Sequence, residues 1–242
     1  MSAEKKIPPE MFDPKCNMTP EMTAKLYDNW SGAVAKALGG SDRGKARVLD
    51  VGAGTGACGE EVRRSGFLMW GRGRSVRGRS EKVRVLDVGA GTGACGEELA
   101  KLGFTNIDAV DGSQGMLSQA EGKHIYNRLI CAFVGPNRLD IEADTYDAIA
   151  CSAVFAPNHL KEDCLPELIR VAKPASVSPA GGYIIITLRE EYLYIVEDYI
   201  NKLEPAMARL QDEGLWERVS RDVFKMYEVE DKDGITFVFK VL

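Results

Sequence analysis

The chain has 242 residues, 45% of them hydrophobic, which is enough to bury the core of one α/β domain or of one domain with an insertion. A net charge of -5 gives no general attraction for nucleic acid or for an anionic membrane. The opening stretch "MSAEKKIPPEMFDPK" lacks the apolar run of a signal peptide, and we find no stretch of membrane-spanning length.

Six cysteines are present, and no two of them form a CxxC pair. They are Cys16, Cys58, Cys95, Cys131, Cys151 and Cys164. We interpret them as reduced thiols of a cytoplasmic protein, with a nuclear location as the alternative, and we expect no metal site.

The first predicted element is a helix from about residue 20 to residue 38, because Thr19 is a suitable N-cap and Pro20 suits the first helical position. From residue 83 onward, predicted strands and helices alternate, which is typical of a parallel sheet. The strands span 83–88, 107–110, 129–134, 146–151 and 183–188, and the helices span 95–102, 114–121, 164–171 and 190–213.

The C-terminal segments "DVFKMYEVE" and "GITFVFKVL" flank "DKDG", a turn signal that predicts an antiparallel hairpin. Five alternating strands and this hairpin add up to seven. We therefore expect an α/β fold with a Rossmann-like seven-stranded, mostly parallel sheet, helices on both faces and an antiparallel C-terminal hairpin.

One stretch, "VLDVGAGTGACGEE", occurs twice, at 48–61 and at 85–98. The segments 47–67 and 84–104 are identical at 17 of 21 positions with a constant offset of 37, which indicates a tandem duplication. Each copy is expected to form a strand, a glycine turn and the start of a helix.

The two copies lead into different segments of the chain. After the second copy, "TNIDAVDGS" supplies another strand and an acidic residue, whereas "LMWGRGRSVRGRSEK" after the first reads as an Arg/Gly-rich linker. We therefore assign the binding site to the second copy. The alternative is that the first copy takes the central strand while residues 68–104 loop out.

The glycines of the second copy, Gly89, Gly91 and Gly93, let the backbone turn sharply and approach a ligand closely. Asp111 ends the next strand, where a carboxylate can accept both hydroxyls of a ribose. A dinucleotide site would fit the same glycine pattern. Asp87, just before the turn, favours a ligand with an ammonium group over a pyrophosphate.

Four stretches carry a resemblance to a known family: "VLDVGAGTG", "VDGSQGML", "TYDAIACSAVF" and "LPELIRVAKP...GGYIIIT". They resemble the successive motifs of class I S-adenosylmethionine-dependent methyltransferases, over most of residues 83 to 242. Within that class, "DGSQGMLSQA" and "LPELIRVAKP" are most similar to the methyltransferase-like family named for the Williams-Beuren syndrome region.

This resemblance implies S-adenosyl-L-methionine as the cofactor and assigns residues around it. Its methionine end would be lined by Asp87, Gly89, Gly91 and Gly93. Asp111 would bind the ribose, and the adenosine side would meet Gly112, Ser113 and Met116. Gly135 would lie near the adenine edge, and Cys151 and Ser152 would form the floor of the cofactor pocket.

The resemblance also divides the chain into an N-terminal helical cap (1–45), the duplicated copy with its linker as an insertion (46–82) and a methyltransferase domain (83–242). The stretch "YDNWSGAVAKAL" is shorter than the family's N-terminal helix. Together with the duplication, this shortened cap predicts impaired activity.

His159 follows the fourth predicted strand, where such sheets present catalytic groups, and it is the candidate catalytic residue. A surface-loop histidine is the alternative.

We predict a methyltransferase for an unknown acceptor, a small molecule by preference, and we do not expect a nucleic-acid partner. The alternatives are an NAD(P)-dependent oxidoreductase and a non-catalytic cofactor-binding or RNA-associated protein. The sequence gives no oligomeric state.

Overall fold

The computed structural model of the chain describes residues 83–242, apart from 102, 179–180 and 228–231. Every prediction for residues 1–82 lies outside this range: the N-terminal helix and cap, the first copy of the repeat and the Arg/Gly-rich linker. No helix among the described residues combines the length and the apolar character needed to cross a membrane.

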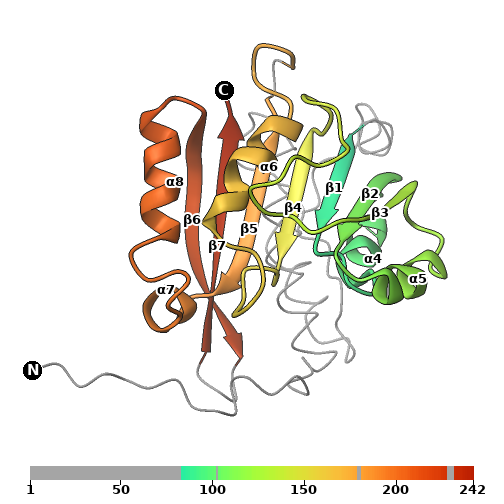
Figure 1. Cartoon of the computed structure of the whole chain (residues 1–242), viewed down its shortest axis with the longest axis horizontal. Helices are drawn as coiled ribbons and strands as arrows, with labels where there is room; N and C mark the ends of the chain where they lie inside the picture. The colour runs from blue at the N-terminus through green and yellow to red at the C-terminus, as the bar shows by residue number, and fades with distance from the viewer. Residues whose placement is uncertain (1–82, 102, 179–180, 228–231) are drawn as a thin grey trace, which may run out of the picture.

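The described strands form a seven-stranded sheet with the order β3-β2-β1-β4-β5-β7-β6 (Figure 1). They are β1 (Arg84–Val88), β2 (Asn106–Asp111), β3 (Arg128–Cys131), β4 (Ala148–Ser152), β5 (Tyr183–Arg189), β6 (Trp216–Tyr227) and β7 (Lys232–Val241). Pairs among the first five strands are parallel, and β7 pairs antiparallel with β5 and β6. Every residue of β4 is buried, as expected for a parallel strand covered on both faces.

Helices cover both faces of this sheet. They are α4 (Ala94–Lys101), α5 (Gln114–Glu121), α6 (Leu165–Val171), α7 (Tyr192–Ile195) and α8 (Leu203–Asp212), with a 3-10 turn at Glu162–Cys164. Leu99 of α4 shares a buried cluster with Val85 of β1. On the opposite face, Leu168 of α6 and Met207 of α8 share a cluster with Leu86. The predicted α/β fold, with its seven strands and C-terminal hairpin, is confirmed.

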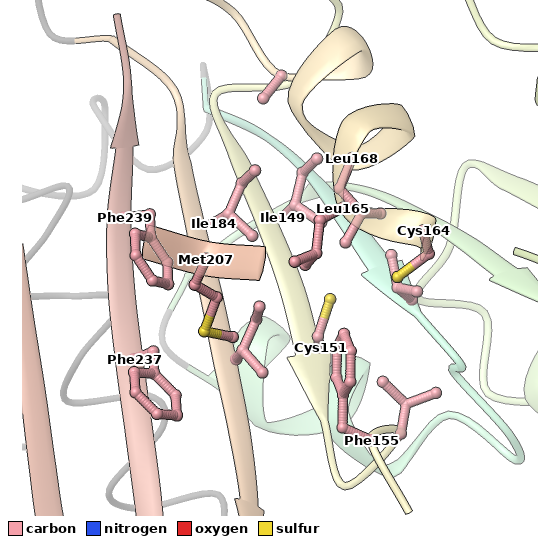
Figure 2. Packing of buried hydrophobic residues seen from close by; sticks show 14 of the residues in the cluster. Ile149, Cys151, Phe155, Cys164, Leu165, Leu168, Ile184, Met207, Phe237 and Phe239 are labelled. Atoms are coloured by element: carbon pink, nitrogen blue, oxygen red, sulfur yellow. The ribbon is translucent and has the colours of Figure 1, made fainter. Parts of the chain in front are cut away.

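The larger core lies between the sheet and the helices α6 and α8 (Figure 2). At its β6 edge, the fully buried Trp216 stacks on Phe239 with a centroid distance of 4.0 Å. The indole Nε1 donates to the Met207 carbonyl at 3.0 Å, so the one polar atom of this ring is paired. The hairpin is therefore fixed to α8 as well as to the sheet.

The predicted single helix at 190–213 is wrong, because the chain forms α7 and α8 with an irregular connection between them. Val196 after α7 is extended, with φ -93° and ψ 119°. Tyr199 in the connection is 1% exposed, and its hydroxyl contacts the carbonyls of Ala156 at 2.7 Å and Leu160 at 2.8 Å. The interruption thus allows a tertiary contact with the loop after β4.

Most strand ends differ from the prediction by one or two residues, and two differences are larger, at the end of β3 and at the hairpin turn. Strand β3 ends at Cys131, before the predicted end, because Cys131 pairs with Asp111, the last residue of β2. The predicted turn lies too late in the chain, since β7 begins at Lys232 and Gly234 pairs within the strand. A side chain at Gly234 would collide with the ring of Phe224.

Candidate functional site

The glycine turn joins β1 to α4 at the carboxyl end of the central strand (Figure 1). Gly89, Gly91 and Gly93 have φ values of +66°, +55° and +89°, which other residues adopt only with strain. Among the described residues, a Cβ on Gly91 would come within 4 Å of one atom, the Met116 sulfur, at 3.8 Å. The described part of the chain therefore leaves space in front of Gly91, where a ligand can approach the backbone.

Asp111, at the end of β2, connects this turn to the start of α5. Its Oδ2 accepts a hydrogen bond from the Gly91 amide at 2.9 Å, and its Oδ1 accepts one from the Ser113 amide at 2.7 Å. Ser113 caps α5, and its hydroxyl accepts from the Met116 amide at 3.3 Å. A carboxylate has further lone pairs, so Asp111 can still accept from a ligand hydroxyl.

Asp87 lies beneath the turn, not in front of it. The residue is 1% exposed, and its Oδ2 accepts the Tyr126 hydroxyl at 2.7 Å. The Cys95 thiol and the Gly96 amide are further donors. Burial raises the pKa of Asp87 to about 6, although these hydrogen bonds favour the charged form and act to lower it. The Asp87 carboxylate is therefore held by groups of the protein beneath the turn.

Two apolar side chains flank the end of β2. Met116 is 46% exposed, and Phe133, just after β3, is 79% exposed. A Cβ on Gly112 would lie only 2.6 Å from the Phe133 ring, so the glycine lets this ring lie against the backbone. Gly135 follows in the same loop, where its Cβ would meet Asn137 at 3.3 Å.

The two predicted floor residues lie at the end of β4 and point to opposite faces of the sheet. The Cys151 side chain is fully buried in the core beside α6, among the residues of Figure 2. Ser152 is 7% exposed on the α4 side, and its hydroxyl has no hydrogen-bond partner within the described part of the chain. Of the two side chains, only Ser152 is oriented for a pocket on the glycine-turn side.

His159 lies in the loop that follows β4, and its side chain is exposed. Its Nδ1 lies 2.9 Å from the Pro157 carbonyl, which can only accept a hydrogen bond. Nδ1 therefore carries a proton, and Nε2 of the neutral ring is left as the basic atom. The same loop reaches the glycine turn, because a Cβ on Gly89 would overlap the Val154 side chain.

Sequence reasoning missed Tyr126, Phe133 and Val154. Tyr126 lies in the polar segment "KHIYNR" and Phe133 within a predicted strand, so no local pattern separates them from packing residues. Among the described residues, no group of three or more His, Cys, Asp or Glu side chains is arranged to hold a metal ion.

The chain is similar in sequence to known methyltransferases. Residues 85–175 match the sequence profile of a family described as "Methyltransferase domain". "Methyltransferase-like protein 27" of Homo sapiens is 32% identical over 172 residues, which are 71% of this chain and 51% of that protein. The chain thus spans about half the length of this curated relative.

Among solved structures, a putative S-adenosylmethionine dependent methyltransferase from Listeria monocytogenes has a similar fold. The TM-score is 0.51 at 14% identity, over 67% of this chain and 92% of that chain.

Proposed function

Because the chain carries a class I S-adenosylmethionine-dependent methyltransferase domain, we propose that it transfers a methyl group from this cofactor to a small-molecule acceptor. The observation that carries the proposal is the space that the described residues leave in front of Gly91. Gly91 follows β1, and Asp111, which binds its amide, ends the adjacent parallel strand β2. Ligands of open α/β sheets bind at this edge, outside the carboxyl ends of the strands.

The residues around the turn fit the parts of S-adenosylmethionine. The turn of Gly89, Gly91 and Gly93, with the partly exposed backbone of Gly91, suits the methionine end, and the remaining lone pairs of Asp111 suit the ribose hydroxyls. Met116, near Gly91, and Phe133, against Gly112, present exposed apolar surface close to the end of β2, which suits a flat adenine ring. Gly112, Ser113 and Gly135 complete the adenosine side.

The bound cofactor would supply a sulfonium methyl group that is already electrophilic, so the protein has to orient the acceptor and remove its proton. Nε2 of His159 can take that proton, since Nδ1 is held by the Pro157 carbonyl. The Ser152 hydroxyl at the end of β4 has no hydrogen-bond partner among the described residues, so it can orient a polar acceptor group or the methionine end of the cofactor.

We expect His159→Ala to lower turnover by roughly a hundredfold, the lower range for loss of a general base, and to leave S-adenosylhomocysteine affinity within about twofold. Formation of S-adenosylhomocysteine from S-adenosylmethionine, with a panel of small amines, thiols and hydroxyl compounds, identifies the acceptor and measures the rate. Full turnover by the variant would show that His159 is a surface-loop residue and not the general base. Absence of turnover with every acceptor in the panel would count against a small-molecule substrate.

We propose that the protein acts in the cytoplasm. We also propose that it belongs to the methyltransferase-like family named for the Williams-Beuren syndrome region. In support of the first, Cys95, Cys131, Cys151 and Cys164 are all free thiols. In support of the second, the human relative covers 71% of the chain.

A further inference from the structure

Tyr126 contacts the glycine turn at Gly93 and the start of α4 at Gly96, and not at Gly91, where the described residues leave space. It precedes β3, and the chain there is held by a hydrogen bond of 2.8 Å from the Asn127 amide to the Ile107 carbonyl. The ring would lie 3.1 Å from a Cβ on Gly93, and it would overlap a Cβ on Gly96. Two glycines thus make room for one aromatic ring beneath the turn.

The Tyr126 hydroxyl donates to the Asp87 carboxylate, which is almost completely buried. The groups that interact with this carboxylate come from four parts of the fold. On its own face of the sheet they are Tyr126 before β3, Cys95 and the Gly96 amide of α4, and Asp111 of β2, while Cys151 of β4 interacts electrostatically from the other face. Burial raises the pKa of Cys95 and of Cys151 well above the usual range, and burial and the charge of Asp87 do the same for Tyr126. These three groups stay neutral at physiological pH.

We propose that Tyr126 is a positioning residue of the cofactor site, whose hydroxyl keeps Asp87 ionised and fixed beneath the glycine turn. From there the buried negative charge attracts the ammonium group of the cofactor without direct contact. This inference rests on the proposed binding of S-adenosylmethionine at the turn, and it adds a residue that the sequence motifs do not indicate.

The ionised form of Asp87 opposes folding, which points to a role other than stability. Its pKa rises from 3.8 in the unfolded chain to about 6. A carboxyl group with a raised pKa contributes stability that is fully present below pH 3.8 and is lost as the pH rises through 6. At neutral pH the charge is therefore kept at a cost in stability, and the Tyr126 hydrogen bond reduces that cost.

The test is the affinity for S-adenosylhomocysteine, measured by calorimetry between pH 5 and pH 8. We expect the affinity of the parent chain to fall on acidification with a midpoint near pH 6, where Asp87 becomes protonated. Tyr126→Phe removes one hydrogen bond to the charged form, so the midpoint should move up by roughly one pH unit. At pH 8 the affinity of this variant should return to within a few-fold of the parent value.

Two further variants separate positioning from simple packing. Gly96→Ala pushes the Tyr126 ring away and should shift the midpoint upward as Tyr126→Phe does, whereas Gly59→Ala, at the equivalent position of the first copy, should leave the profile unchanged. Asp87→Asn should bind more weakly than the parent chain and lose the transition near pH 6.

If Tyr126 had only a structural role, the Tyr126→Phe variant would bind S-adenosylhomocysteine more weakly by the same factor at every pH. Its unfolding temperature would fall, and the pH midpoint of binding would stay that of the parent chain. That result would overturn the inference while the proposed function stands. Absence of S-adenosylhomocysteine binding by the parent chain at pH 8 would overturn both.

Discussion

Gly91→Val is expected to abolish S-adenosylhomocysteine binding, with an affinity loss of roughly a hundredfold or more. Within the described part of the chain, a Cβ in front of Gly91 would meet only the Met116 sulfur, at 3.8 Å, so the new side chain fills ligand space and does not displace the described core residues. Calorimetric titration of the purified variant measures the effect.

Two controls match this substitution. Gly54→Val changes the equivalent glycine of the first copy and should leave binding intact. Gly103→Val places the same side chain at φ +90°, where no atom of the described residues lies within 4 Å of the added Cβ, so it reproduces the backbone strain away from the site. If Gly54→Val abolishes binding and Gly91→Val does not, the first copy is the site. If each retains partial binding, the two copies exchange in the central strand.

Asp111→Ala is expected to weaken S-adenosylhomocysteine binding by about 1.5 to 3 kcal/mol, the value of charge-assisted hydrogen bonds. The structure adds a second reason, because the substitution also removes the acceptor that holds the Gly91 and Ser113 amides. Both the ligand contact and the shape of the turn are lost together.

Asp111→Asn is the matched variant, since one oxygen acceptor remains while the charge is removed. We expect its affinity to lie between those of the parent chain and Asp111→Ala. Unchanged affinity in Asp111→Ala would exclude the assignment of this residue to the ribose.

The fold was predictable because the chain from residue 83 alternates short apolar runs with amphipathic segments. The errors arose where a tertiary contact determined the backbone. Tyr199 interrupts the predicted long helix to bind two carbonyls of the loop after β4, and no local pattern in "EDYINK" reports those partners. Likewise β3 ends where its neighbour β2 ends, which depends on pairing and not on the β-propensity of "CAFV".

The candidate site was predictable to the extent that it lies on consecutive motifs. Gly89, Gly91, Gly93 and Asp111 follow from a glycine run and an acid at the end of the next strand. The orientation of Asp87 did not follow, because its donor Tyr126 is 39 residues away in the sequence. The Cys151 side chain also could not be assigned to a face until the register of β4 with β1 was known.

The most direct measurement of the central claim is a parallel calorimetric titration of the full chain with S-adenosylhomocysteine, NADH and NADPH. All three ligands carry an adenosine, but only S-adenosylhomocysteine carries an ammonium group and no phosphate. A methyltransferase site at the turn between β1 and α4 predicts one S-adenosylhomocysteine bound per chain and no binding of either dinucleotide. Saturable binding of NADH or NADPH without binding of S-adenosylhomocysteine would contradict it.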